Sequence, residues 1–222
     1  ATGALLCLDV TEAVLDEAIA LGYNLVISHH PLIFKGYKSI TGKDYVERCI
    51  LKAIKNDIVI YSAHTNLDNA YGGVNYKIAE KIGLKNLQVL EPKENSLQDD
   101  LMQAGAGIVG ELDEPETELE FLKRIKKTFE VGCVRHNRLT GREIQKVALC
   151  GGAGAFLLPQ AIRAGADVFI TGEIKYHDYF GHEGDILMAE IGHYESEQYT
   201  KEIFYSIIRD LFPNFALQSS KI

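Results

Sequence analysis

Short apolar runs alternate with segments of helical periodicity along most of this 222-residue chain, and that alternation limits the folds open to it. Strands that are joined by helices need crossover connections, which build parallel sheets with helices on their faces. We therefore predict an α/β fold with largely parallel sheets. The expected strands are 5–10, 24–30, 58–64, 87–90, 132–136, 146–150, 167–171, 186–191 and 215–218, and the expected helices are 11–21, 44–55, 74–82, 117–129, 157–164 and 196–211.

A polar stretch at residues 91–103 interrupts the alternation, since it contains Pro92 and a run of acids and amides. A similar pair of segments lies on each side of it: NLVISHHP and IVIYSAHTNLD before it, and DVFITGEIKYHD and ILMAEIGHYESE after it. Each pair contains a strand, a polar turn and a second strand that ends in His-x-x-x-acid. We predict two intertwined, related α/β units, residues 1–95 and 96–222, that together form one domain. Each unit is expected to supply ligands to a metal site in the cleft between them.

Charge and composition exclude several classes of protein. Lys and Arg number 23 against 31 Asp and Glu, a net charge of −8 that makes nucleic acid an improbable partner. No apolar run reaches the roughly 18 residues of a membrane-spanning helix. The chain opens without Met, a charged leader or a signal-like apolar core, so we expect a cytoplasmic protein with a missing N-terminal piece. The cysteines lie in apolar segments without a CxxC pair and are expected to be buried free thiols: Cys7, Cys49, Cys133 and Cys150.

Six of the seven histidines fall in three short segments at or just after predicted strands. Reactive groups of parallel sheets gather at the carboxyl ends of strands, so these segments are the expected site. Acids stand at helpful spacings: Asp68 four residues after His64, Glu197 four after His193, and Glu173 four before His177. A lone histidine at a strand end more often packs than binds a ligand. That interpretation is preferred for His182, and His136 is expected on an exposed basic face.

The combination of imidazoles and carboxylates without thiolates suits Zn, Mn, Fe, Co or Ni. Five ligands from three segments favour two ions, about 3.5–4 Å apart, that share a bridging carboxylate. The five predicted metal ligands are His29, His30, Asp68, His193 and Glu197.

The glycine-rich segment CGGAG at residues 150–154 allows two interpretations. Its backbone N–H groups could bind an anion, or it could be a tight turn. The segment lacks the dinucleotide fingerprint and a Walker lysine, and the chain has no Gly-x-Ser-x-Gly elbow.

Four ordered motifs carry a family resemblance: ISHHPLIFKG, AHTNLDNAYGGVN, CGGAGAFLLPQAIRAGADVFITGEIKYHDYF and GHYESEQ. Through them the chain resembles the YbgI-like dinuclear-metal-centre family, the GTP cyclohydrolase I type 2 homologues. The resemblance implies a toroidal homohexamer and metal ligands at the same five residues, with Glu197 bridging the ions. It also implies that His64, Glu173 and His177 line the cleft, in proton transfer, ligand support or substrate contact.

Two departures from the family pattern give further expectations. Family members usually begin some tens of residues earlier, in agreement with a missing N-terminal piece. Some members carry an inserted α/β domain between the halves, and residues 91–103 stand at the corresponding place. This chain is either a short form of the family or lacks an insert domain near residues 91–103, and we favour the missing insert.

The first functional hypothesis is a metal-dependent hydrolase with two divalent ions per chain, Mg being a further candidate metal. His64 or His177 would move the proton. The resemblance implies GTP as substrate, and another nucleotide or phosphoester suits the same metals. The alternative is a non-enzymatic hexamer that stores, delivers or senses metal, or acts as a scaffold.

Overall fold

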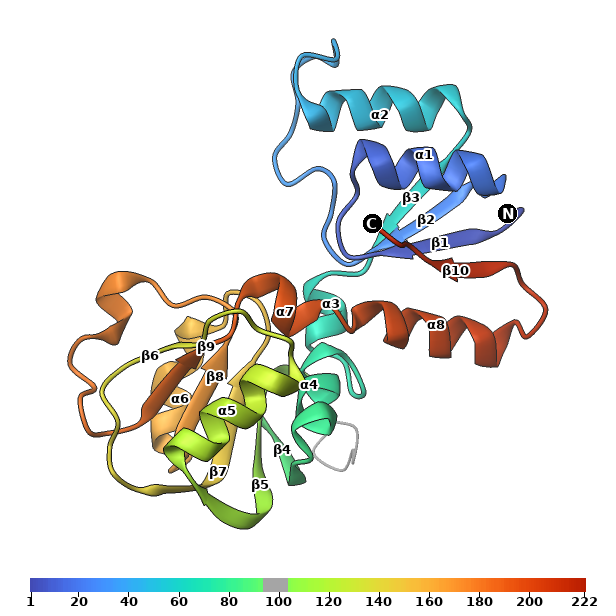
Figure 1. Ribbon diagram of the computed structural model, residues 1–222. Coiled ribbons are helices and arrows are strands. Elements are labelled where there is room, and N and C mark those ends of the chain that lie inside the picture. The colour runs from blue at the N-terminus through green and yellow to red at the C-terminus, as the bar shows by residue number, and fades with distance from the viewer. Residues whose placement is uncertain (94–103) are drawn as a thin grey trace. The chain divides into compact units, whose positions relative to one another are not determined.

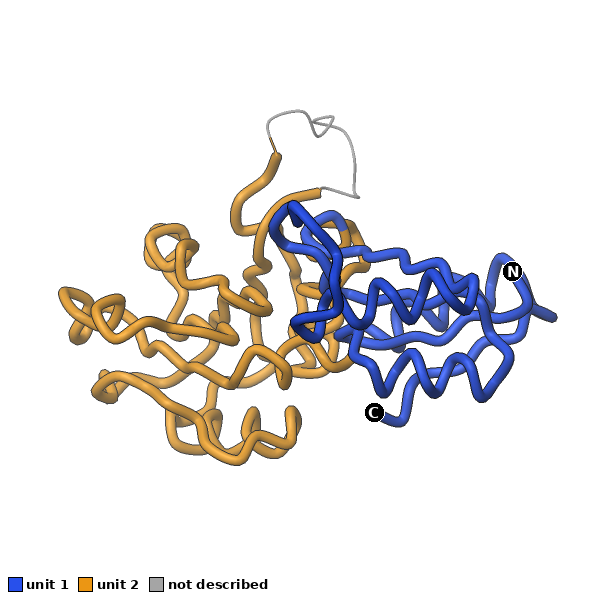
Figure 2. Tube along the Cα trace, turned by 90° about the horizontal axis from the view of Figure 1, so that it is seen from above, with its two compact units in different colours: residues 1–66, 200–222 blue, residues 67–199 orange. Residues whose placement is uncertain are grey.

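The chain forms two compact α/β units, each built around its own sheet. The computed structural model describes residues 1–93 and 104–222 (Figure 1). Unit 1 comprises Ala1–Asn66 together with Thr200–Ile222, and unit 2 is Leu67–Tyr199 (Figure 2). The mixed α/β architecture confirms the predicted fold class.

The boundary between the units differs from the predicted division at residue 95. The C-terminal strand β10 (Leu217–Ser219) pairs in parallel with β1 (Ala4–Cys7), so the last segment of the chain belongs with the first. This return makes unit 1 discontinuous in sequence and leaves unit 2 as one continuous stretch. The insert predicted near residues 91–103 falls, from residue 94 onward, outside the described residues.

Unit 1 contains a four-stranded sheet in the order β10-β1-β2-β3, with every pair parallel. Helix α1 begins where the Thr11 side chain accepts the Val14 N–H, and it ends at Gly22, whose positive φ of 70° suits glycine. Buried Leu5 and Leu15 lie in the core between strands and helices. The remaining elements are β2 (Leu25–Ser28), β3 (Val59–Ser62), α1 (Glu12–Leu21), α2 (Tyr45–Lys55) and α8 (Thr200–Leu211).

Unit 2 contains a six-stranded mixed sheet in the order β4-β5-β7-β8-β9-β6. Only β7, β8 and β9 run parallel, so the expectation of largely parallel sheets holds for unit 1 and for the middle of this sheet. The strands are β4 (Lys85–Pro92), β5 (Gly105–Thr117), β6 (Arg135–His136), β7 (Glu143–Cys150), β8 (Val168–Thr171) and β9 (Leu187–Glu190).

Helices α4 and α5 of unit 2 contact β5 and β7, while α6 contacts β4 and β8. The predicted helix 196–211 is two helices in the structure, α7 and α8, and the division between the units falls between them. The helical elements are α3 (Thr65–Asp68), where the chain passes from unit 1 to unit 2, α4 (Val74–Ile82), α5 (Glu118–Thr128), α6 (Leu158–Arg163), α7 (His193–Glu197), and the 3₁₀ turns η1 (Ala155–Leu157) and η2 (Tyr176–Tyr179).

The two units share two local features. Each has three consecutive strands side by side and parallel, β1-β2-β3 in unit 1 and β7-β8-β9 in unit 2. In each unit, a buried carboxylate also accepts hydrogen bonds from the N–H groups of a Thr-Gly loop. Glu47 accepts the N–H groups of residues 41 and 42 at 2.8 Å, and Glu118 accepts those of residues 140 and 141 at 2.8 and 2.9 Å.

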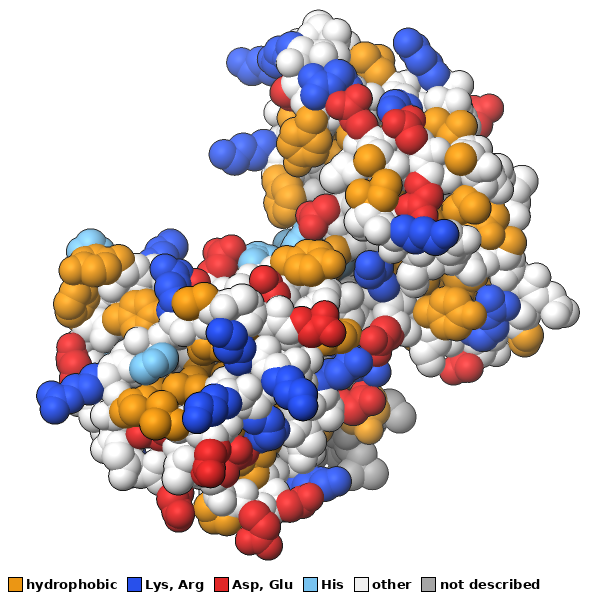
Figure 3. Space-filling model, viewed as in Figure 1, with side chains coloured by type: hydrophobic (Ala, Val, Ile, Leu, Met, Phe, Trp, Pro, Cys, Tyr) orange, Lys and Arg blue, Asp and Glu red, His pale blue; other side chains and the backbone are white. Residues whose placement is uncertain are grey.

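The surface and the cysteines bear on two further predictions. Within residues 1–93 and 104–222, no helix is both long and apolar enough to cross a membrane. On the face shown in Figure 3, Lys and Arg side chains are interspersed with Asp and Glu. Three cysteines are buried, but Cys133 is exposed, which contradicts the predicted burial of all four. Cys133 lies in the irregular segment between α5 and β6, where no sheet or helix face covers it.

Candidate metal-binding residues

Three histidines of unit 1 come together just beyond two adjacent parallel strands. His29 and His30 follow β2, and His64 follows β3, whose Ser62 is in register with Ser28. The ring centroids are 4.9 Å apart for His29 and His30, 5.4 Å for His29 and His64, and 5.5 Å for His30 and His64. One nitrogen from each ring lies within 4.8 Å of the others, so the group can hold a metal ion.

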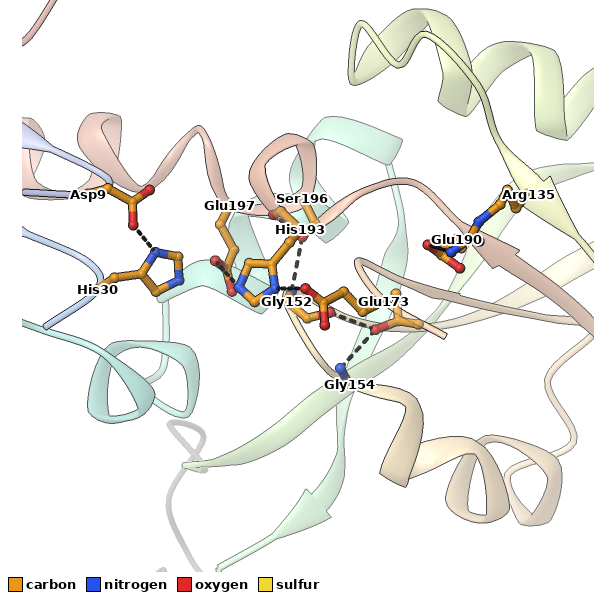
Figure 4. Close-up of polar contacts among 11 residues, drawn as sticks. Asp9, His30, Arg135, Gly152, Gly154, Glu173, Glu190, His193, Ser196 and Glu197 are labelled. Atoms are coloured by element: carbon orange, nitrogen blue, oxygen red, sulfur yellow. Dashed lines mark hydrogen bonds and ion pairs between the residues drawn. The ribbon is translucent and has the colours of Figure 1, made fainter. Parts of the chain in front are cut away.

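Hydrogen bonds fix the orientation of two of these rings. Buried His29 donates from Nδ1 to the Ala63 carbonyl at 2.9 Å, which leaves the lone pair of the neutral ring on Nε2. His30 Nδ1 lies 2.9 Å from Asp9 Oδ1, so that carboxylate selects the same tautomer (Figure 4). An acceptor on the remote ring nitrogen is the usual support of a metal-binding histidine.

Like His29 and His30, His193 in unit 2 has its Nδ1 hydrogen-bonded to an oxygen atom. Its ring lies between two carboxylates (Figure 4). Its Nδ1 is 2.7 Å from Glu173 Oε1, and its Nε2 is 3.2 Å from Oε2 of Glu197, one turn along α7. Glu197 and then Glu173 raise the pKa of His193 to about 9, although partial burial of the ring opposes the shift. The pair of carboxylates therefore favours a positive charge at this position, which a proton supplies when no metal does.

Asp68 and the glycine-rich loop are tied together within unit 2. The Asn75 side chain, 2% exposed, donates to the Asp68 carbonyl at 2.9 Å and accepts the Gly151 N–H at 2.9 Å. Ser196 Oγ accepts the Gly152 N–H at 3.0 Å and donates to the His193 carbonyl at 2.8 Å. These bonds hold Asp68, the loop and α7 as one framework.

Gly152 is required where it stands. Its φ of +60° lies in the left-handed region, and a Cβ there would collide with Glu197 Oε1 and lie 3.3 Å from His193 Nε2. The loop therefore leaves room beside these two side chains because it has no side chain of its own. Since the N–H groups of Gly151, Gly152 and Gly154 donate to Asn75, Ser196 and Thr171, the loop is a tied turn and not an anion cradle.

The buried thiol of Cys150 stands at the end of β7 in the same part of unit 2. Burial first, and then the charges of Asp68 and Glu197, raise its pKa to about 12. The thiol therefore stays protonated at neutral pH, and no cysteine is among the candidate ligand groups found in the described residues. Together with the oriented imidazoles, this donor set fits divalent cations of the N/O-binding kind.

The residues predicted to act beside the metal have different surroundings. His64 contacts both unit 1 ligand candidates, and the Phe34 ring lies 5.9 Å from it. Glu173 orients His193 through the bond to Nδ1. His177 lies in the exposed turn η2, with the rings of Tyr176 and Phe180 at 5.1 and 6.0 Å.

Three residues that support the site, Asp9, Asn75 and Ser196, were not predicted from the sequence. Asp9 could have been found, because it follows β1 by two residues and the carboxyl ends of parallel strands were the expected site. Asn75 and Ser196 bind main-chain atoms, and such contacts have no spacing rule by which a sequence reveals them.

Comparison with known proteins identifies the family and the fold of this chain. The model of the Duf34/NIF3 (NGG1p interacting factor 3) family matches residues 1–222. A GTP cyclohydrolase 1 type 2 homolog of Clostridium perfringens is 38% identical over 199 residues, which are 88% of this chain and 73% of the relative. One of Lactococcus lactis is 34% identical over 220 residues, with 96% and 79% covered.

Solved structures show the same fold. A Staphylococcus aureus hypothetical protein superposes with a TM-score of 0.89 at 32% identity, covering 100% of this chain and 85% of the other. The protein ybgI, described as of unknown function, superposes with a TM-score of 0.81 at 27% identity, covering 99% and 83%. This chain belongs to the Duf34/NIF3 family.

Proposed function

We propose that this protein binds two divalent metal ions and uses them to hydrolyse a small substrate. The ligands are His29 and His30 from unit 1, and Asp68, His193 and Glu197 from unit 2. One observation carries the proposal: His29, His30 and His193 each have Nδ1 hydrogen-bonded to a carbonyl or carboxylate oxygen, which makes Nε2 the ring nitrogen that can bind a metal ion. Zn, Mn, Fe, Co, Ni and Mg are the candidate metals.

The residues around these ligands have distinct tasks in the proposal. Bound divalent ions supply Lewis acidity and lower the pKa of water. Asp9 and Glu173 hold His30 and His193 in the tautomer that presents Nε2, and Glu197 is the bridging carboxylate. His64, beside His29 and His30, accepts or returns the proton of the hydrolytic step.

A small pocket beside the His193 support favours an enzyme over a store of metal. It has a volume of about 290 Å³ and is lined by Ala153, Ala155, Phe156, Glu173, Lys175 and Asp178. Lys175 can bind an anionic group and Phe156 an apolar or aromatic one. The name GTP cyclohydrolase 1 type 2 homolog, carried by the relatives, also supports a nucleotide or phosphoester substrate.

Metal content per chain tests the proposal first. The expected result is about two ions in the wild type, loss of at least one in His30→Ala and in Glu197→Ala, and no change in His136→Ala, an exposed histidine outside the ligand set. Hydrolysis of GTP and of simple phosphoesters is then measured on the loaded protein. An unchanged metal content in both ligand variants would refute the ligand assignment.

A protein that binds or delivers metal without turnover is the second candidate. One observation favours it: His64 has a nitrogen within 4.8 Å of those of His29 and His30, close enough to be a ligand instead of a proton carrier. His64→Gln separates the two functions. Loss of turnover with metal retained supports the hydrolase, while loss of metal supports the binding protein.

We also propose the homohexamer implied by the family resemblance. Light scattering during gel filtration should then give six times the 24.7 kDa of one chain. A smaller mass would contradict this assembly without affecting the ligand assignment.

A further inference from the structure

Unit 2 has an open groove of about 650 Å³ whose lining contains none of the proposed metal ligands. One wall is the segment 134–138, which includes β6. The other wall is built from η2 and the residues after it. The lining consists of Val134, Arg135, His136, Asn137, Arg138, Tyr176, Tyr179, Phe180 and Glu183.

The first wall is fixed to strand β9. Arg135 and His136 pair with β9 as the short strand β6. The Asn137 side chain donates to the Ile186 carbonyl at 2.9 Å and accepts the Met188 N–H at 2.9 Å, which extends the strand pairing through a side chain. The two arginines of the groove therefore stand on a wall with little freedom to move.

A single carboxylate joins the two walls. Glu190, at the end of β9 and 9% exposed, forms an ion pair with Arg135 (Figure 4) and accepts a hydrogen bond from the Tyr179 hydroxyl at 3.1 Å. Burial first, and then the Glu190 charge, raise the pKa of Tyr179 to about 12, so the hydroxyl remains a donor. The groove is thus pre-formed, which lowers the cost of binding a ligand.

Two aromatic rings are exposed on the second wall. Tyr176 is 74% and Phe180 51% exposed, and their ring centroids are 5.1 Å apart. Exposed aromatic rings beside cations are what proteins use to stack nucleobases. A planar ligand that covers these rings removes apolar surface from water, which favours binding.

Arg138 is the cation of the groove that can serve a ligand. The other arginine of the lining, Arg135, is paired with Glu190, and Glu183 is the acid of the lining itself. Arg138 has no ion pair among the residues that the structure describes. A guanidinium in such a place suits a phosphate group, which it can bind through two parallel N–H donors.

We propose that this groove binds a nucleoside phosphate, with the base against Tyr176 and Phe180 and the phosphate against Arg138. The volume of about 650 Å³ lies in the usual range for small-molecule sites, so the occupant is a mononucleotide or the end of a strand. Because stacking tolerates every base, the site discriminates weakly between bases. Binding needs no metal.

Calorimetric titration of the chelator-treated full chain tests the proposal. AMP, adenosine and inorganic phosphate are the probes, and AMP is expected to bind at least tenfold more tightly than either of the other two. Tyr176→Ala and Arg138→Ala should each weaken AMP by about 5-fold or more, the scale of one lost stacking or phosphate contact. Glu183→Gln should strengthen it by about 2-fold.

Two matched variants keep the result specific. Tyr45→Ala and Arg163→Ala remove a tyrosine and an arginine from other surfaces and should leave AMP affinity unchanged. The site is refuted if Tyr176→Ala and Arg138→Ala bind AMP as the wild type does, or if phosphate alone binds as tightly as AMP. A Tyr176→Ala variant that changes the oligomeric mass but not AMP affinity also overturns it, since the rings would then be an assembly surface. The affinities for AMP and for a short oligonucleotide ending in AMP are then compared. Tighter binding of AMP identifies a free nucleotide as the ligand, and tighter binding of the oligonucleotide identifies a strand end.

Discussion

Glu173 accepts a hydrogen bond from Nδ1 of His193 at 2.7 Å, on the side of the ring away from Glu197. Glu173→Gln keeps an acceptor there but removes its charge. We expect the affinity for the metal to fall roughly 10-fold, the usual effect of losing such a support. Competition with a chromophoric chelator measures the change, and Glu143→Gln on the exposed start of β7 is the control. Equal affinities in all three proteins would show that Glu173 does not act through His193.

The raised pKa of His193 predicts two opposite trends with rising pH: the stability of the metal-free protein falls, and its affinity for metal rises. In the metal-free form, the stabilising contribution of protonated His193 is complete below pH 6.5 and is lost as the pH rises through about 9. Metal binding must displace this proton, so it tightens over the same range. Denaturant unfolding of chelator-treated protein and metal titrations, each from pH 6 to about 10, test both trends. His193→Asn should flatten both.

Asn75 is expected to support stability as well as the position of Asp68. Asn75→Leu keeps the number of side-chain heavy atoms but leaves the Gly151 N–H and the Asp68 carbonyl without their side-chain partner. Each buried group so orphaned costs about 1–3 kcal/mol of the free energy of unfolding. Urea unfolding measures the loss, with exposed Asn214→Leu as the control. A variant as stable as the wild type would mean that other groups or water replace the amide.

Gly152→Ala separates two effects of one methyl group. The positive φ alone costs about 1–2 kcal/mol, and the new Cβ also displaces the Glu197 carboxylate. Gly165→Ala is the matched control, because Gly165 has a φ of +69° and a Cβ added there would meet nothing within 4 Å. Both variants should lose stability, but only Gly152→Ala should lose metal. Equal metal content in the two would contradict the close approach of Glu197.

Cys133 should be the one thiol that reacts rapidly in the native protein. Cys7 and Cys150 are buried, and burial is the main cause that raises the pKa of each to about 12. Cys49 is buried as well, with its pKa also raised. Mass spectrometry after brief iodoacetamide treatment should find one label, and none in Cys133→Ser. Fast labelling of a second cysteine would show that its segment opens readily.

Local signals predicted the regular elements best where caps and periodicity agree. The helix at 74–82 has the predicted bounds and ends at Gly83, and Thr11 caps α1 as expected. Strand β5 was missed, since its glycines and acids weaken the pattern and its pairing with β4 and β7 decides its conformation. The predicted strand 132–136 shrinks to Arg135–His136, which pair with β9 only at the sheet edge.

Spacing also predicted part of the candidate site. Parallel strand ends bring His29, His30 and His64 together, and the i,i+4 spacing brings His193 to Glu197. The supports of these side chains are less predictable, because Ala63 acts through its carbonyl and Asn75 through two main-chain atoms. The joint action of all five ligands stays a prediction that the metal analysis tests.

The pairing of β10 with β1 also dictates an order of events during synthesis. The continuous stretch Leu67–Tyr199 can fold as soon as it has left the ribosome. The first sixty-six residues emerge earlier, yet their sheet must wait for Leu217–Ser219 before its edge at β1 is covered. Residues 1–66 are therefore completed after the stretch that follows them, and they need protection from aggregation for longer.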